Sequence, residues 1–120
     1  MALENGWVDA DRNAFVSLRL AKGEPIECLI DTGFNRELFL PLDLAESLEL
    51  RITGEQEFIV AGGARLPGFT SLVDIEWLGT RRLAEAILHE GNDLLIGTAL
   101  LQGTRLNIDY IYNTVQIEKP

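Results

Sequence analysis

One carboxylic acid in this chain stands where it could act as a chemical reagent. Asp31 follows the apolar segment 26–30 and precedes Thr32 and Gly33. An acid at the end of a buried strand needs polar partners other than water, and Thr-Gly supplies a hydroxyl and a free backbone N–H at a tight turn. Asp and Gly are also the ordinary residues of a chain reversal, so the tripeptide alone leaves a purely structural role open. The residues around Asp31 must therefore show whether its role is chemical or purely structural.

The segments around Asp31 have the patterns of short β-strands. Residues 13–20 alternate between apolar and mixed faces, which predicts a half-buried strand. After a Gly- and Pro-containing turn at 21–25, residues 26–31 return as the second strand of a hairpin that ends at Asp31. A third strand is predicted over 37–41, and a short helix over 42–48 behind Pro41.

A run of small residues forms a second candidate site. Ala61, Gly62, Gly63 and Ala64 lie between two β-prone arms, residues 57–60 and 69–78, and paired glycines in such a place predict a hairpin. A plain surface hairpin has this pattern. A functional hairpin has it too, because bare backbone N–H and C=O groups can hold an extended peptide.

The last forty residues predict a strand, a short helix and a closing hairpin. Residues 81–90 are assigned to a strand with His89 at its polar end, where no cysteine or second histidine could join it in a metal site. The apolar run 94–96 ends at Gly97, as a buried strand would, and Thr98 is expected to cap a short helix that stops at Gly103. Residues 105–118 then form a hairpin that reverses at 112–114.

Length and composition restrict the classes of function. A chain of 120 residues with 47% hydrophobic and 24% charged residues is expected to be one ordinary globular domain, spanning 1–120 with its core at about 13–118. Nineteen acidic residues against ten basic ones give a net charge of -9, which opposes binding to nucleic acid or anionic lipid. Peptides, small molecules or another protein chain are the expected partners.

Cysteine usage and hydropathy indicate the compartment. The single cysteine, Cys28, cannot form an internal disulfide, which fits a reducing compartment, and no metal cluster or cofactor is predicted. No apolar run approaches the roughly 20 residues of a membrane-spanning helix. A cytoplasmic protein is therefore expected.

Taken together, these motifs resemble the retropepsin-like aspartic proteases, in particular the small bacterial and archaeal proteases of clan AA. The resemblance covers about residues 15–118 and rests on LIDTG, on LFLPLDLAESLEL, on AGGA and on LLIGTALLQGTRLNIDYIYNTVQIE. The last block is also similar to the end of the retropepsin domain of DNA-damage-inducible proteins. The resemblance implies a mostly β fold: a closed barrel with one or two short helices, paired as a homodimer with its active site on the two-fold axis.

The chemistry of peptide hydrolysis also requires two copies of the chain. Peptide hydrolysis by two carboxylates needs one ionised as general base on a water and one protonated to polarise the scissile carbonyl. The chain has one Asp-Thr-Gly, so a second copy would have to supply the second Asp31. Two such carboxylates about 3 Å apart cannot both ionise and would titrate as a coupled pair.

The resemblance also implies roles for other residues. Thr32 would hydrogen-bond across the two-fold axis, the Gly33 N–H would support the carboxylate, and Gly97, next to Ile96, would pack beneath the catalytic loop. The segment 61–64 would be the tip of a flap that closes over an extended peptide, and Ile96 would contribute to the same substrate-binding site.

Four residues at three sites depart from the family pattern. Phe34 stands where many retropepsins have Ala or Ser and is expected to reshape the pocket. Arg36 replaces a small residue, and Thr98-Ala99 replaces a polar pair that often ties the short helix to the catalytic loop or the partner chain.

Three hypotheses follow from the sequence. The leading one is a homodimeric aspartic endopeptidase acting on peptide or protein substrates. The second is a catalytically inactive retropepsin-like module for peptide binding or dimerisation, and the third is an acidic β-sheet adaptor unrelated to proteolysis. A protein that stays monomeric at high concentration would favour the third hypothesis, because a monomer cannot pair its single Asp31.

Overall fold

The computed structural model describes residues 2–120, which form a predominantly β structure with two short helices. Within this range no helix is both long enough and apolar enough to cross a membrane. The elements in chain order are β1 Ala2–Val8, β2 Ala14–Leu20, β3 Ile26–Ile30, β4 Leu38–Pro41, α1 Leu42–Ser47, β5 Ile52–Glu55, β6 Phe58–Ile59, β7 Arg65–Leu66, β8 Phe69–Trp77, β9 Thr80–His89, β10 Leu95–Ile96, α2 Thr98–Leu101, β11 Arg105–Asp109 and β12 Thr114–Lys119.

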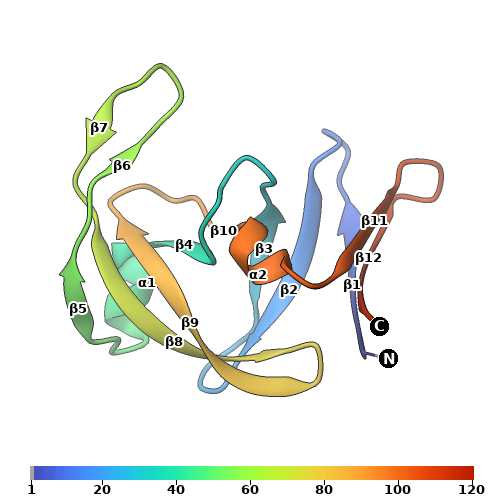
Figure 1. Ribbon diagram of the computed structural model, residues 1–120, viewed down its shortest axis with the longest axis horizontal. Helices are drawn as coiled ribbons and strands as arrows, with labels where there is room; N and C mark the ends of the chain where they lie inside the picture. The colour runs from blue at the N-terminus through green and yellow to red at the C-terminus, as the bar shows by residue number, and fades with distance from the viewer. Residues whose placement is uncertain (1) are drawn as a thin grey trace.

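Six strands close into a barrel at the centre of the molecule (Figure 1). Their order is β2-β3-β10-β4-β9-β8, and β8 pairs back onto β2 through Arg19 with Glu76 and Leu20 with Ile75. Two of the pairings, β3 with β10 and β4 with β9, are parallel. Because neighbouring parallel strands run in the same direction, β3 and β10 end side by side, and Asp31 and Gly97 follow these two ends.

The core is built on the strands of this barrel and extends to β1, β12 and α2, and the barrel strands follow the predicted alternation. Strand β2 buries Val16 and Leu18, and β3 buries Cys28 and Ile30. The predicted strands around Asp31 and helix α1 are confirmed, and residues 80–89 form a strand, as expected. Other fully buried side chains of the core are Leu38, Leu40, Ile75, Leu88, Ile96, Leu100 and Ile117.

The first strand, β1, was not predicted. Its residues include Glu4, Asn5 and Gly6, which are poor strand formers. Strand β1 is held by pairing on both sides, with β12 and with β2, so tertiary contacts override local propensity. Glu4 is almost completely buried in this arrangement, where it accepts hydrogen bonds from the Leu78 backbone N–H at 2.8 Å and from Arg19 at 3.0 Å.

The glycine-containing hairpin differs from the prediction in its second arm. Residues 58–66, called the glycine hairpin below, consist of β6 and β7, with Phe58 opposite Leu66 and Ile59 opposite Arg65. The expected arm, residues 69–78, instead forms β8 and pairs with β9 along its whole length. The glycine hairpin stands away from the barrel at the upper left of Figure 1.

Candidate active site

Asp31 lies in a tight turn at the end of β3. Its backbone N–H donates to the Ile96 carbonyl at 3.0 Å, which continues the pairing with β10 by one residue. The Gly33 N–H donates to Asp31 Oδ1 at 2.9 Å, and the Phe34 N–H donates to the Asp31 carbonyl at 3.1 Å. Asp31 is half-buried and Thr32 is exposed. One oxygen of the carboxylate is therefore held by the turn, while the side chain stays partly accessible.

Gly97 lies where no side chain fits. A Cβ on Gly97 would be 2.3 Å from the Arg36 carbonyl oxygen and 2.5 Å from both the Phe34 carbonyl oxygen and Phe34 Cδ2. The Gly97 N–H donates to the Glu37 carbonyl at 3.0 Å. The loop 31–37, which follows β3, is thus in direct backbone contact with the end of β10.

Helix α2 joins this loop through its first residue. The Thr98 N–H donates to the Phe34 carbonyl at 2.8 Å, and Thr98 Oγ1 donates to the same oxygen at 3.3 Å. Thr98 was expected to cap the helix, and this expectation is wrong: Gly97 is the N-cap and no side chain caps α2. The Thr98 hydroxyl instead binds the loop that carries Asp31.

The tip of the glycine hairpin owes its shape to backbone conformation. Gly62 and Gly63 have φ of +95° and +87°, which residues with a side chain adopt at a cost. The Val60 N–H donates to the Ala64 carbonyl and the Gly63 N–H donates to the Val60 carbonyl, both at 3.0 Å. All four residues from Ala61 to Ala64 are exposed. The Gly63 N–H and the Ala64 carbonyl are bonded within the hairpin, which leaves the backbone groups of Ala61 and Gly62 for a ligand.

Comparison with known proteins identifies this arrangement. No family model matches the sequence, and no curated protein matches it. Among solved structures, a retropepsin-like aspartic protease from Rickettsia conorii superposes with a TM-score of 0.70 over 96% of this chain and 89% of its own, at 13% identity. EIAV protease in complex with the inhibitor HBY-793 has a TM-score of 0.66 over 78% of this chain and 89% of its own, at 18% identity.

This chain has the retropepsin-like fold. The predicted fold class is therefore confirmed: a mostly β, closed barrel with two short helices. At these identities the likeness establishes the retropepsin-like fold and leaves activity to be argued from the residues.

Phe34 takes part in an aromatic cluster in this retropepsin-like chain. Its half-buried ring lies 5.7 Å from the ring of Phe39 on β4. Phe39 in turn lies 5.0 Å from Phe58 of the glycine hairpin and 3.8 Å from His89, on which it stacks nearly parallel. The cluster connects the loop 31–37, the glycine hairpin and β9, so the Phe34 ring is turned toward β4 and Gly97.

His89 is buried, although the sequence placed it at a polar strand end. Its Nδ1 accepts from the Gly91 N–H at 3.0 Å, so the other ring nitrogen carries the proton and donates to the Asp93 carbonyl at 2.8 Å. Both ring nitrogens are occupied by backbone groups, which supports a structural role for His89. Residues 2–120 contain no cluster of three or more potential metal-ligating side chains.

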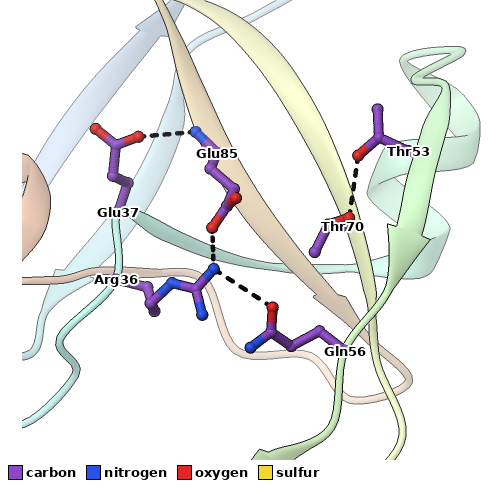
Figure 2. A network of polar contacts seen from close by, with 6 residues as sticks. All are labelled: Arg36, Glu37, Thr53, Gln56, Thr70 and Glu85. Carbon is purple, nitrogen blue, oxygen red and sulfur yellow. Dashed lines mark hydrogen bonds and ion pairs between the residues drawn. The ribbon is translucent and has the colours of Figure 1, made fainter.

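A polar network beside the loop was not foreseen from the sequence (Figure 2). Arg36 pairs with Glu85 on β9 and also reaches Gln56 Oε1 at 3.4 Å, at the base of the glycine hairpin. Glu37 pairs with Arg82 and accepts from the Glu85 backbone N–H at 2.9 Å. The unusual Arg36 was a signal in the sequence, but its partners lie 20 and 49 residues away in the chain.

Cys28 lies on β3, three residues before Asp31, and is fully buried. Burial raises the pKa of the Cys28 thiol to about 12, because the apolar surroundings disfavour the charged thiolate. A thiol in this state is a poor nucleophile and a poor metal ligand. Of the groups near the loop, the Asp31 carboxylate therefore remains the candidate for chemistry.

Proposed function

We propose that this protein is an aspartic endopeptidase that hydrolyses peptide bonds as a homodimer, with one Asp31 from each subunit. The observation that carries the proposal is the position of Asp31: it ends β3 of a retropepsin-like barrel, in a turn bonded to β10 and adjacent to α2. Since each chain has one Asp-Thr-Gly, the second carboxylate comes from the second copy.

The two carboxylates would share one proton. Like charges about 3 Å apart cannot both ionise, so one Asp31 serves as general base on a water while the other donates a hydrogen bond to the scissile carbonyl. The proton taken from the water then reaches the leaving amine through the pair, which acts in turn as base and acid. The Gly33 N–H, 2.9 Å from Asp31 Oδ1, holds the carboxylate in a fixed orientation within the turn.

The residues around the pair have supporting roles in this proposal. Thr32, exposed at the loop surface, bonds across the two-fold axis, and Gly97 with Ile96 fixes the loop from beneath. The segment 61–64 forms the tip of a flap, whose exposed backbone groups bind an extended peptide and exclude water. A cytoplasmic location belongs to the same proposal, since the only cysteine is a buried thiol.

The test is cleavage of a mixed peptide library between pH 4 and 7 by the wild-type protein and by Asp31→Asn. The variant keeps the shape of the side chain and its acceptor oxygen but cannot act as a base, so cleavage should fall at least about a thousand-fold. Circular dichroism and sedimentation of the two proteins control for folding and assembly. Cleavage that survives in Asp31→Asn would exclude Asp31 as the catalytic group. Peptide binding without cleavage by the wild-type protein would favour the inactive binding module.

A further inference from the structure

The turn between β11 and β12 exposes three consecutive large side chains. Tyr110 is 60% exposed, Ile111 83% and Tyr112 78%. Ile111 and Tyr112 are the two most exposed large hydrophobic residues of the described chain. A hairpin turn is normally built from Gly, Asn, Asp, Ser and Pro, so the turn itself does not require this composition. Contiguous exposed apolar surface of this kind marks interaction sites.

The turn is rigid, although its side chains are exposed. Asp109 Oδ1 accepts from the Ile111 N–H at 2.7 Å and from the Tyr112 N–H at 3.1 Å. Asn113 takes a left-handed conformation with φ of +58°, and its carbonyl accepts from the Val8 N–H at 3.0 Å. Little conformational entropy is lost when a held backbone presents its side chains to a partner.

The turn lies on the same edge of the molecule as the Asp31 loop. In Figure 1 the glycine hairpin, the loop between β3 and β4 and the β11–β12 turn all rise to the upper edge, with the loop in the middle. A two-fold axis that brings two Asp31 carboxylates together must run through this edge. An axis that runs along this edge passes both the Asp31 loop and the β11–β12 turn. Each β11–β12 turn then meets the same turn of the other copy, as an isologous interface requires.

We propose that Tyr110, Ile111 and Tyr112 anchor the homodimer by packing against the same residues of a second copy. The inference rests on the proposed function, which supplies the reason for a second copy, and adds the surface that holds it. Tyr side chains suit such a contact, because they bury a large area with few rotatable bonds and keep a polar end.

The surface area of the three side chains indicates what share of the dimer interface they could form. Taking about 200 Å² for each side chain, the exposed fractions leave roughly 400 Å² per copy to be covered. A stable interface buries about 800 Å² per partner. The β11–β12 turn would therefore supply about half of the interface, and the Asp31 loop and glycine hairpin would supply the rest.

The negative charge of the chain opposes dimerisation, so a dimer needs an attractive contact such as this one. Each copy carries a net charge of -9, so two copies repel each other. An apolar contact is not weakened by salt, whereas the repulsion is screened by it. The dimer should therefore tighten as sodium chloride is raised from low to moderate concentration.

Sedimentation equilibrium of the purified protein tests the inference without any peptide. The triple variant Tyr110→Ser, Ile111→Ser, Tyr112→Ser removes the exposed apolar groups and leaves Asp109 and the backbone bonds in place. We expect its dimer dissociation constant to rise at least about a hundred-fold, the effect of losing one or two interface anchors. The control is Leu72→Ser with Leu83→Ser, which removes side chains 50% and 57% exposed on β8 and β9 and should leave the constant unchanged.

Disulfide trapping gives a second measurement. Ile111→Cys should form a covalent dimer under diamide, because the two turns meet, while Leu83→Cys should cross-link only at the slow rate of random collision. The buried Cys28 does not interfere. A triple variant that dimerises as tightly as the wild-type protein, a wild-type monomer at every concentration, or equal trapping of the two cysteine variants would each overturn the inference.

The outcomes separate the two proposals. A dimer that depends on the three residues but cleaves no peptide leaves the inference standing and refutes the peptidase. Cleavage that depends on Asp31 in a triple variant with unchanged dimerisation supports the peptidase and refutes the anchor.

Discussion

Gly97→Ala tests how the fold holds the Asp31 loop. The new Cβ would lie 2.3 Å from the Arg36 carbonyl oxygen and 2.5 Å from the Phe34 carbonyl oxygen. Backbone conformation is no obstacle, because Gly97 has φ of -116°, which any residue adopts. The substitution therefore isolates the steric contact between β10 and the loop.

The displacement can be worked out from these distances. Ordinary contact begins near 3.4 Å, so the Arg36 carbonyl must recede by about 1 Å, the difference from 2.3 Å. Overpacking of this kind costs about 1–3 kcal/mol of stability, and we expect the upper end because two of the three crowded atoms are backbone oxygens. A shift of about 1 Å in a catalytic loop lowers a rate roughly a hundred-fold.

The assay combines urea denaturation with kcat/KM for a peptide identified in the library. Gly79→Ala is the matched control, because Gly79 lies in the β8–β9 turn with φ of +77° and open space around a Cβ. The free energy of unfolding of Gly79→Ala should fall by about 1–2 kcal/mol through backbone strain alone, and its kcat/KM should equal that of the wild-type protein.

Two results would contradict this role of Gly97. If Gly97→Ala were as stable as the wild-type protein, the close approach of β10 and the loop would be absent in solution. If it were destabilised but cleaved peptide as fast as Gly79→Ala, the position of the loop would not control Asp31.

Two other predictions concern groups buried in the fold. The Cys28 thiol, with its pKa raised from 9.0 to about 12, stabilises the folded state fully below pH 9, and this stability is lost as pH rises from 9 to 12, by about 1.4 kcal/mol per pH unit. Urea unfolding between pH 8 and 10.5 should therefore show a steeper loss in the wild-type protein than in Cys28→Ala, and equal slopes would contradict the burial of the thiol. Glu4→Leu should cost about 1–3 kcal/mol, because the buried Leu78 N–H loses its acceptor, whereas Glu4→Gln keeps an acceptor oxygen and should cost less. Thermal unfolding compares the two variants, and equal losses would show that the Arg19 ion pair, rather than the hydrogen bond, carries the effect.

Local patterns predicted much of this fold. Strands β2 and β3 follow from alternating side chains, and the β11–β12 hairpin follows from two β-prone segments around a reversal. Strand β9 was predicted from its place between other strands. The glycine hairpin was located by Gly62 and Gly63, but its second arm was misplaced because a two-residue strand such as β7 has no periodicity to detect.

Contacts between distant segments escaped prediction. Strand β1 exists because β2 and β12 pair with it, and the burial of His89 depends on Phe39, fifty residues earlier in the chain. Arg36 was recognisable as unusual, yet nothing in its neighbourhood indicated Glu85 or Gln56 as partners.

The groups available for chemistry can be recognised in the sequence: one Asp-Thr-Gly turn, a pair of glycines between β-prone arms, and a glycine after an apolar run. These are local features, because turn conformation and side-chain alternation depend on neighbours in the chain. The contact between Gly97 and the loop that carries Asp31 arises only in the folded protein, through the parallel pairing of β3 with β10. Strand pairing joins segments 66 residues apart, and its energy comes from burial and hydrogen bonds that exist only once the barrel has closed.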